Sequence, residues 1–534
     1  MARAAISRLD ELCRLPAGAE PSFLGWEETQ PLERRVPDPV SEGVALAAPV
    51  PVAAPAERGK RADHAELAFL DLHEVAALVR ARSVSPVELC ELALDRVGRF
   101  DAELGAFITV TAELATARAA AAEREIAAGD YRGPLHGVPI SLKDLFSTAG
   151  IRTTRGSRLY EDFVPKSNAT AWDRLADQGA VLVGKNNMME FAMAAEVGNE
   201  RWGVTRNPWD LARTAHGSSS GSAVAVATGM AYASVASETG ASIQRPASFC
   251  GVVGMKPSYG RISRSGVAPT SWSMDHVGVL TRSVLDAAIV LEAMVGHDPL
   301  DATTRPGQRV DWSSRLGSER RLREIRLGVP RRHIEGHVDD EVEAAFWAAV
   351  EEFRSAGATV VDVDPPALEY AATTAVTLRT AEACAHHAAT LRRTPEGYSD
   401  ALRRQLEQGM SLTAVDYLQA QRARRVIGAE MSAVFGEIDL LLSPTTPTAA
   451  TLIEDGMQAV RDRPWEVGPH QYNVARVFSL LGFPVLSLPC GYTRSGLPIS
   501  LQIGGRRWEE TTLLAAAREY EHRTHWLRPP PTYA

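Results

Sequence analysis

The chain has 534 residues, 45% of them hydrophobic and 23% charged, and its formal net charge is −9. This is the composition of a globular protein with a large core, and the acidic balance argues against a general nucleic-acid-binding surface. Five scattered cysteines argue against a disulfide framework or a zinc site and favour a reducing cytoplasm, and no apolar run reaches the roughly 18 residues of a membrane span.

Residues 1–62 are expected to form an N-terminal extension or linker. Its most apolar part, VALAAPVPVAAPA at 44–56, is interrupted by prolines and comes too late for a usual signal peptide. A docking strap, a dimer contact and a partly ordered tail are all open as its role. Residues 63–534 are predicted to form a single domain.

Three helices are predicted at the start of this domain. Apolar residues recur at helical spacing over 72–79. The text SPVE at 85–88 has the form of a capping box with proline at the first helical position. The alanine-rich stretch 112–128 predicts the third helix, which ends at Gly129.

Short apolar runs bounded by glycine and proline predict the strands. These runs are VPISLK within 133–150, AVLVGK at 180–185, TVVDVD at 359–364, DLLLSP at 439–444, PVLSLPC at 484–490 and PISLQIGG at 498–505. Further helices are predicted over 342–353 and 511–522. Because helices alternate with short apolar strands, we expect an α/β fold with a mostly buried sheet.

The stretch ARTAHGSSSGSAVAVATG at 212–229 places three serines between two glycines. Residues 217–221 match the G-x-S-x-G pattern of a nucleophile elbow, with Ser219 as the nucleophile. An elbow directly follows an apolar strand, whereas NPWDLARTAH at 207–216 is predicted to be a loop, which disfavours this interpretation. The alternative is that the serines cap a buried helix, whose N-terminus also concentrates free N–H groups.

Ser242 and Lys143 are the further candidates for chemistry. A short strand is predicted to end at Glu238-Thr239, and a turn of small residues then presents Ser242 among backbone N–H groups, either as a nucleophile or as a mere cap. Lys143 lies at the end of the apolar run VPISLK. Its spacing favours a lysine that reaches solvent or pairs with Asp144. The alternative is a buried lysine with a lowered pKa that accepts a proton at neutral pH.

The block 217–266 resembles the signature of the amidase signature family. That family carries a glycine/serine-rich segment, a motif close to G-G-S-I-R-x-P-A, and then C-G-x-x-G-x-K-P. The texts that match these three motifs are HGSSSGSA, GASIQRPA and CGVVGMKP. Further matching texts outside them are GVPISLKD, KNNMMEFAM, RNPWD, SMDHVG, SPTTP and GLPISLQIGG. The resemblance covers roughly residues 66–522 and implies a large mixed central sheet covered by helices on both faces.

The resemblance also implies a Ser–Ser–Lys triad. Ser242 would be the nucleophile and Lys143 the base. Ser218 would bridge them after a cis peptide bond to Gly217, and Ser219 would support the network by hydrogen bonding. The oxyanion hole would consist of the backbone N–H groups of Thr239, Gly240, Ala241 and Ser242.

Neither a metal nor an organic cofactor is implied by the resemblance. His386 and His387 lie in a helical context without a metal-binding motif, and a structural role is favoured for them. Ordinary core packing is equally open for the residues expected to line the substrate pocket, which are Met189, Glu190, Phe191 and Trp272.

The chain departs from the usual family text Asp-x-Gly-Gly-Ser-Ile-Arg around the nucleophile. It has Glu238 and Gln244 at the two ends, and Ala241 in place of a glycine, which is expected to exclude a positive φ there. Gln244 removes a charge that Arg245 either compensates or does not. His216 replaces a glycine before the serines. These departures predict an altered substrate pocket.

We expect a cytoplasmic serine hydrolase that cleaves a small-molecule carboxylic amide through an acyl-enzyme on Ser242, with aryl amides, esters and carbamates left open. Neither a nucleic acid nor a membrane is expected as a partner, and a homodimer is open. The main alternative is the glutaminase-like A subunit of a tRNA-dependent amidotransferase, which the N-terminal extension and Gln244 disfavour. Two further possibilities are an esterase using Ser219 and a non-catalytic amide-binding protein, and the intact set of Lys143, Ser218 and Ser242 argues against the second.

Overall fold

The computed structural model describes residues 64–193, 198–306, 310–316, 322–456 and 473–534. The extension predicted for residues 1–62 lies outside these ranges. In the described ranges, no helix combines the length and the apolar character that a membrane span requires.

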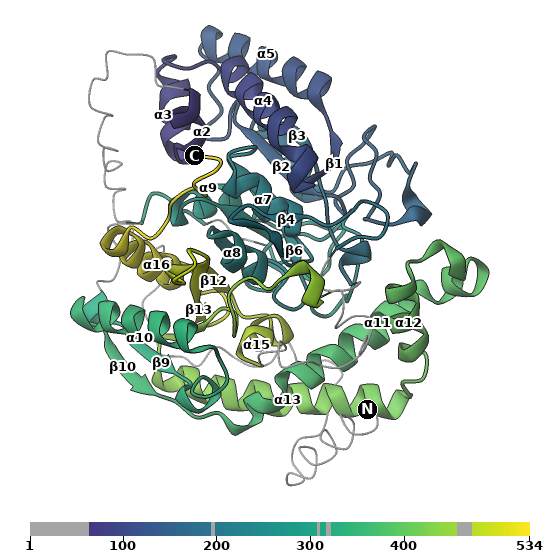
Figure 1. Ribbon diagram of the computed structural model, residues 1–534, viewed down its shortest axis with the longest axis vertical. Helices are drawn as coiled ribbons and strands as arrows, with labels where there is room; N and C mark the ends of the chain where they lie inside the picture. Colours follow the sequence, from purple (N-terminus) through teal and green to yellow (C-terminus); the bar gives the residue numbers. More distant parts are fainter. Residues whose placement is uncertain (1–63, 194–197, 307–309, 317–321, 457–472) are drawn as a thin grey trace.

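A mixed sheet occupies the centre of the described part (Figure 1). Its eleven strands follow the order β1-β3-β2-β6-β8-β7-β12-β13-β11-β9-β10. The strands are β1 (Phe107–Val110), β2 (Pro139–Lys143), β3 (Val181–Asn186), β6 (Ala233–Glu238), β7 (Val253–Lys256), β8 (His276–Thr281), β9 (Arg326–Val329), β10 (Thr359–Asp362), β11 (Leu440–Pro444), β12 (Val485–Tyr492) and β13 (Pro498–Gly505). β2 is parallel to both of its neighbours, β3 and β6, whereas β6 is antiparallel to β8. The predicted α/β class and mixed sheet are confirmed.

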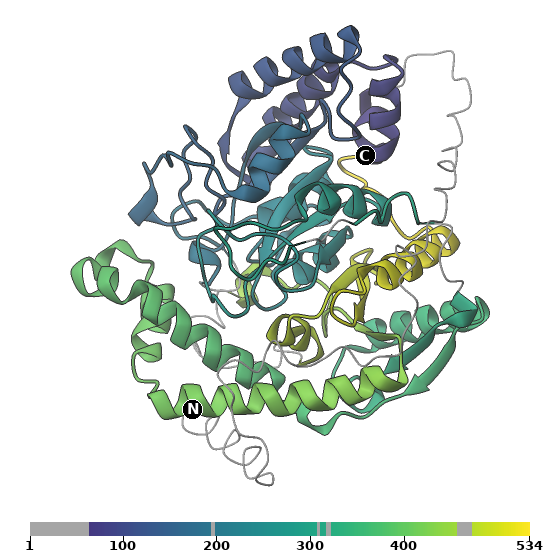
Figure 2. The same ribbon diagram turned by 180° about the vertical axis from the view of Figure 1, so that it is seen from behind.

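Helices surround this sheet, as the two opposite views show (Figures 1 and 2). They are α2 (His64–Phe69), α3 (Leu72–Arg80), α4 (Pro86–Leu104), α5 (Ala112–Ala128), α6 (Thr170–Asp177), α7 (Ser220–Ala227), α8 (Gln244–Cys250), α9 (Val284–Met294), α10 (Asp340–Ser355), α11 (Ala371–Arg393), α12 (Asp400–Gly409), α13 (Ala414–Glu437), α15 (Asn473–Leu481) and α16 (Glu510–Thr524). The long helices α11 and α13 run along one end of the molecule in both views.

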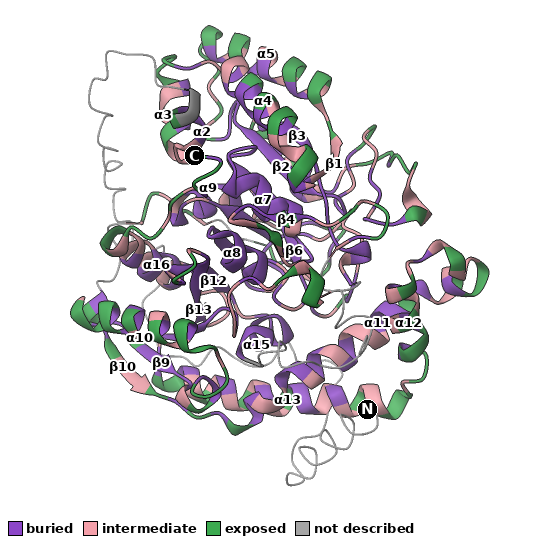
Figure 3. Cartoon of the chain, viewed as in Figure 1, coloured by how far each residue is buried: buried purple, intermediate pink, exposed green. Residues whose placement is uncertain are grey.

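The two faces of the sheet pack against different helices. In β3, Leu182 joins the hydrophobic cluster that contains the residues of α9, whereas Val181 and Val183 join the cluster that contains those of α7. Because successive strand residues point to opposite faces, α7 and α9 cover opposite faces of the sheet. Figure 3 shows α8 buried along its whole length and α7 buried from Gly221 to Ala227.

Most of the predicted elements are confirmed. The stretch 112–128 is α5, and Gly129 ends it with a φ of 100°. α4 begins at Pro86, and Ser85 Oγ accepts the backbone N–H of Glu88 at 3.0 Å. Local residues thus account for the start of α4, where Ser85 caps a free N–H group, and for the end of α5, where Gly129 adopts the left-handed conformation.

The loop predicted over 207–216 is wrong. The segment forms a small hairpin in which β4 (Arg206–Asn207) pairs with β5 (Asp210–Thr214), outside the central sheet. Its polar residues carry no apolar alternation, and the pairing is supported instead by Asn207, whose side chain donates to the carbonyls of Thr214 and Phe249 at 3.2 and 2.9 Å. No strand of the central sheet therefore leads directly into the three serines.

Candidate active site

Lys143 is the last residue of β2 and is fully buried. Its Nζ donates to Ser218 Oγ at 2.7 Å and to Ser237 Oγ at 3.0 Å. Burial lowers the pKa of Lys143 to about 7, although the nearby carboxylates of Asp275 and Glu238 oppose this shift. A large fraction of this lysine is therefore neutral near pH 7 and able to accept a proton.

Lys143 does not pair with Asp144. The carboxylate of Asp144 lies 3.3 Å from Lys185 Nζ and accepts the backbone N–H of Thr154 at 2.8 Å. Neighbouring strand residues point to opposite faces, so Lys143 faces the serines while Asp144 faces Lys185. Of the two interpretations of Lys143, the buried lysine with a lowered pKa describes the structure.

Ser218 follows a cis peptide bond to Gly217, as the family resemblance implies. It is almost fully buried, at 1% exposure. A Cβ at residue 217 would lie 2.6 Å from the terminal methyl of Met189. Met189 thus packs directly against the residue before Ser218, which puts this predicted pocket residue beside the lysine–serine pair.

Ser219 is buried, and its Oγ donates to the carbonyl of Ser237 at 3.2 Å. It occupies the N-cap position of α7, but its side chain makes no capping hydrogen bond. The prediction of a side-chain cap is therefore wrong for Ser219, because its hydroxyl is hydrogen-bonded to the carbonyl of Ser237 on β6 instead. Ser237, which no sequence motif indicated, receives hydrogen bonds from both Ser219 and Lys143.

Ser242 lies half-buried in the turn between β6 and α8. This is the position expected from the strand, turn and short helix predicted around it. In the described part of the chain, no hydrogen bond joins Ser242 to Ser218 or Lys143. The structure thus brings Lys143 and Ser218 into contact. Ser242 lies in the turn that follows β6, the strand next to β2.

Two carboxylates support the turn that carries Ser242. Glu238 Oε2 accepts the backbone N–H of Ile243 at 2.9 Å and approaches that of Gln244 at 3.4 Å. Asp275 Oδ1 accepts the hydroxyl of Thr239 at 2.6 Å, and burial raises the pKa of Asp275 to about 6. The motif SMDHVG contains Asp275, so the sequence marked the residue without indicating its role.

Ala241 adopts a φ of 71°, so the expectation that alanine excludes a positive φ at this position is wrong. Gly240, in contrast, has no left-handed φ, but a Cβ there would lie 2.5 Å from Arg476 Nη1. A side chain at residue 240 would therefore displace the guanidinium of Arg476, and Ala241 carries the strained conformation that glycine would adopt freely. Arg476 is only 4% exposed and lies too far along the chain for local patterns to link it to this turn.

The model of the Amidase family matches residues 88–514 of this chain. The chain belongs to this family. It is 40% identical to the A subunit of the glutamyl-tRNA(Gln) amidotransferase of Anaeromyxobacter dehalogenans, over 87% of the chain and 98% of that protein. It resembles the peptide amidase of Stenotrophomonas maltophilia with a TM-score of 0.75 at 31% identity, covering 87% of the chain and 99% of that structure. It also resembles the structure of the glutamyl-tRNA(Gln) amidotransferase A subunit of Thermotoga maritima, with a TM-score of 0.73 at 30% identity, covering 88% of the chain and 98% of that structure. The protein is therefore an amidase, an enzyme that acts on amide C–N bonds.

Two predicted pocket residues of this amidase are held in a packed cluster. Glu190 accepts the hydroxyl of Ser157 at 2.6 Å and the backbone N–H of Ser399 at 3.0 Å. Phe191 has a φ of 47° and packs edge-on against His387, with ring centroids 4.6 Å apart. Both side chains thus connect the region after β3 to α11 and α12, which agrees with the expectation of ordinary packing.

Trp272 lies in a different setting, because its side chain is 49% exposed. Its carbonyl accepts the hydroxyl of Tyr259 at 2.6 Å, which holds the backbone while the indole faces solvent. This exposure distinguishes Trp272 from Glu190 and Phe191, which are buried in the packed cluster.

His387 takes part in the aromatic packing of the same cluster. Its Nδ1 lies 3.0 Å from the hydroxyl of Tyr398, and burial lowers the pKa of His387 to about 3. A neutral imidazole packed edge-on among aromatic rings agrees with the structural role expected for this residue. His386 packs edge-on against it, with ring centroids 4.9 Å apart.

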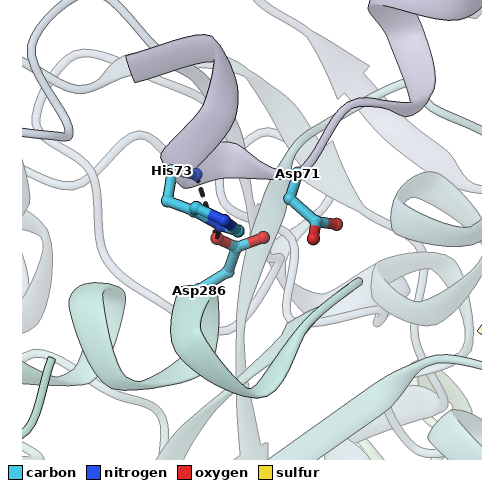
Figure 4. Close-up of side chains that lie close together, drawn as sticks. All are labelled: Asp71, His73 and Asp286. Atoms are coloured by element: carbon cyan, nitrogen blue, oxygen red, sulfur yellow. Dashed lines mark hydrogen bonds and ion pairs between the residues drawn. The ribbon is translucent and has the colours of Figure 1, made fainter. Parts of the chain in front are cut away.

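A cluster of potential metal ligands, Asp71, His73 and Asp286, lies in the described part of the chain (Figure 4). His73 Nδ1 lies 2.8 Å from Asp286 Oδ1. Asp286 also accepts the backbone N–H groups of Leu72 and His73 at 2.9 and 3.0 Å. These bonds hold the start of α3 on α9, which accounts for the buried carboxylate without a metal.

Proposed function

We propose that this amidase hydrolyses a carboxylic amide through an acyl-enzyme on Ser242, with Ser218 and Lys143 as the proton relay. The observation that carries the proposal is the 2.7 Å contact between Lys143 Nζ and Ser218 Oγ in a buried site. A serine hydroxyl is a weak nucleophile until a base removes its proton during attack. A neutral, buried lysine bound to a hydroxyl is a base of the required kind.

Each proton in this reaction has a defined path. Ser242 Oγ attacks the amide carbonyl while Ser218 takes its proton and passes its own to Lys143. The protonated lysine then returns a proton through Ser218 to the amide nitrogen, and the C–N bond breaks. Water attacks the acyl-enzyme by the same relay and releases the acid. Ser218 can act in both directions because a hydroxyl both donates and accepts hydrogen bonds.

The oxyanion would be stabilised by backbone N–H groups of residues 239–242. A residue with a left-handed φ turns successive N–H groups toward one side, and Ala241 has this conformation. The carboxylates of Glu238 and Asp275 accept hydrogen bonds from neighbouring groups and hold the turn in place. Such preorganised donors contribute roughly 2.7–4 kcal/mol each in other enzymes.

The acyl group would lie between Met189 and Trp272. Met189 packs beside Ser218, and the indole of Trp272 is exposed. An aryl amide suits these two apolar side chains, and esters and carbamates would react through the same acyl-enzyme.

A second candidate function is the glutaminase activity of an amidotransferase A subunit. Eight curated relatives carry this name, at 36–40% identity over 86–87% of the chain. They support this candidate better than a free-standing amidase. It would use the same lysine and serines, with glutamine as the amide and a tRNA-binding assembly as the partner, contrary to the expectation of no nucleic acid.

Neither an esterase using Ser219 nor a non-catalytic binding protein is supported by these observations. The hydroxyl of Ser219 donates to a carbonyl in a fully buried position, which gives a substrate no approach to it. Membership of an enzyme family with Lys143 and Ser218 in contact argues against a non-catalytic binding protein.

Labelling with a fluorophosphonate tests the proposed nucleophile. We expect a single adduct, located on Ser242 by intact mass spectrometry and peptide mapping, and a loss of labelling by about 10²–10⁴-fold in Lys143→Ala. An adduct on Ser219 instead, or no adduct on folded protein, would contradict the proposal.

Substrate assays separate the two candidate functions. Release of ammonia from glutamine, increased when the partner subunits of the amidotransferase and glutamyl-tRNA are added, is the expected result for an A subunit. Rapid hydrolysis of 4-nitroacetanilide by the isolated chain, without glutamine turnover in either condition, would support the free-standing amidase.

A further inference from the structure

The carboxylate of Glu238 is the centre of a buried hydrogen-bond network beneath the serine turn. Glu238 is the last residue of β6 and has no exposed surface. One of its oxygens accepts the backbone N–H groups of Ile243 and Gln244, at 2.9 and 3.4 Å. The second oxygen accepts the hydroxyl of Ser479 on α15 at 2.6 Å. A single side chain thus joins β6, the start of α8 and α15 around Ser242.

Gln244 completes this network from the opposite side of the turn. It is fully buried, and its side-chain amide lies directly against the Glu238 carboxylate, so the amide orientation with its nitrogen facing Glu238, which donates to both oxygens, is the one that satisfies both groups. The backbone and the side chain of Gln244 therefore both contact the Glu238 carboxylate. These contacts fix the backbone conformation of Ile243 and Gln244, the two residues that follow Ser242.

The same two positions are those at which the chain departs from the usual family text. Glutamate at 238 is one methylene longer than the aspartate of that text. Glutamine at 244 is shorter than its arginine and carries no charge. A longer acid and a shorter partner span a similar total length, so the two replacements compensate each other in size.

They do not compensate each other in charge. With an uncharged residue at 244, the negative charge of Glu238 acts more strongly on the groups around it, because a neighbouring guanidinium would have offset it. Lys143 and Lys256 interact electrostatically with this carboxylate, and Asp275 interacts with Lys143. His276 lies opposite Glu238 on β8, and Arg476 approaches the turn at Gly240.

We propose that Glu238 and Gln244 form a matched pair that positions the turn bearing Ser242, at the positions where the usual family text has an aspartate and an arginine. Glu238 is a positioning residue, because it acts through the backbone after Ser242 and not on the substrate. Ser479 anchors the pair to α15. The inference rests on the nucleophile role proposed for Ser242 and adds the residues that hold it.

A double-mutant cycle tests the pair, using Glu238→Asp, Gln244→Arg and the double variant. The readouts are the rate of fluorophosphonate labelling at Ser242, and kcat and KM for 4-nitroacetanilide. We expect each single variant to label about 10–100-fold more slowly, since Glu238→Asp leaves buried hydrogen bonds unmade and Gln244→Arg overfills the space beside Glu238. We expect the double variant to recover at least tenfold over Glu238→Asp, with the losses in kcat and not in KM.

The pH profile supplies a readout that a purely structural role would not change. An arginine at 244 offsets the charge of Glu238 and so lowers the pKa of Lys143. The acid limb of kcat/KM should therefore move to lower pH in the double variant than in the wild type.

Two further variants keep the test decisive if Glu238→Asp fails to fold. Ser479→Ala removes only the hydroxyl that reaches Glu238, and should slow labelling about tenfold. Ser248→Ala is the matched control, because it also removes a single buried hydroxyl. The hydroxyl of Ser248, on α8, lies 3.3 Å from that of Thr446, away from the turn. Its labelling should stay within twofold of the wild type.

The outcomes separate this inference from the proposed function. A wild type that labels at Ser242, with additive losses in the cycle and unchanged labelling in Ser479→Ala, would overturn the matched pair alone. A folded wild type that does not label at Ser242 would overturn both.

Discussion

Lys143 has hydroxyl partners on two serines, and this choice of partners matters as much as its burial. A carboxylate at 2.7 Å would hold the lysine in its charged form, whereas a hydroxyl accepts or donates a proton according to the state of the lysine. Asp144, the neighbouring carboxylate, is directed to Lys185 instead. The result is one lysine available for proton transfer and one held in an ion pair, on adjacent strands.

The lowered pKa of Lys143 predicts the pH dependence of both activity and stability. kcat/KM should rise with pH along an acid limb near pH 7, because only the neutral lysine accepts a proton. The folded-state pKa lies below the ordinary value of 10.5, so between about pH 7 and 10.5 the unfolded chain binds more protons and stability rises with pH. Denaturant unfolding across this window measures the slope.

Lys143→Met serves as the matched variant for that experiment. It should be inactive, yet more stable than the wild type at pH 7 by about 1–4 kcal/mol, because an apolar side chain of similar volume replaces a buried ionisable one. Its stability should also rise less between pH 7 and 10. An equal slope in both proteins would contradict the assignment of the shift to Lys143.

Ala241 and Gly240 predict opposite effects of exchanging glycine and alanine. Ala241→Gly should raise the free energy of unfolding by up to about 1 kcal/mol, because glycine adopts a φ of 71° without strain. Gly240→Ala should displace the guanidinium of Arg476 and lower kcat/KM at least tenfold with little loss of stability, since a flexible side chain gives way. Urea unfolding and steady-state kinetics of the two variants check both signs.

At the scale of elements, α7 depends on how closely its first turn approaches the end of β3. A Cβ at Gly221 would lie 2.2 Å from the carbonyl oxygen of Ala106 and 2.7 Å from backbone atoms of Asn187. These are backbone atoms at the ends of strands, which cannot move aside as a side chain can. The helix that follows Ser218 and Ser219 is therefore positioned by contact between main chains.

Gly221→Ala should accordingly be among the most damaging small substitutions in the molecule. We expect a loss of about 3 kcal/mol in the free energy of unfolding, at the upper end of the usual cost of overpacking, together with loss of activity. Gly98→Ala is the control, because Gly98 lies in α4 with no atom within 4 Å of its added Cβ, and it should gain about 0.5–1 kcal/mol. Equal effects of the two changes on thermal unfolding would disprove the close-contact argument.

At the scale of the whole molecule, α3 is tied to α9 across more than two hundred residues by Asp286. The carboxylate accepts three hydrogen bonds, two from the backbone at the start of α3 and one from His73. Burial would lower the pKa of His73, but the bond to Asp286 raises it on balance. For Asp286, burial alone would raise the pKa, and these hydrogen bonds lower it.

Asp286→Asn should therefore destabilise the molecule in a pH-dependent way. The ion pair contributes stability while His73 is protonated and Asp286 is ionised, so its contribution is lost as pH rises through the raised pKa of His73 and as pH falls through the lowered pKa of Asp286. We expect a loss of about 1.5–3 kcal/mol at pH 6 and a smaller loss at pH 9. Kinetic constants should be unchanged, and a loss independent of pH would argue against the ion pair.

Local patterns were sufficient for much of this fold. Runs such as 439–444 and 498–505 predict strands because they are apolar and bounded by glycine or proline, and they match β11 and β13 closely. The hairpin at 206–214 escaped prediction because its pairing depends on Asn207 and not on apolar alternation. The left-handed φ of Ala241 likewise depends on tertiary contacts that no local pattern encodes.

The candidate site was predictable in its parts and not in its connections. Lys143, Ser218 and Ser242 stand in recognisable motifs. Ser237 and Arg476 join the site only through the pairing of strands and the packing of α15, so nothing in their own neighbourhood indicated them.

The burial of lysine in this chain has a practical consequence for chemical handling. The chain has five lysines, and Lys143, Lys185 and Lys256 have no exposed surface, while Lys166 is exposed and Lys60 lies outside the described residues. Amine-reactive cross-linkers or resins would thus attach to the native enzyme without reacting with Lys143, the proposed base. Tags appearing on the three buried lysines would in turn report that the sheet itself had opened.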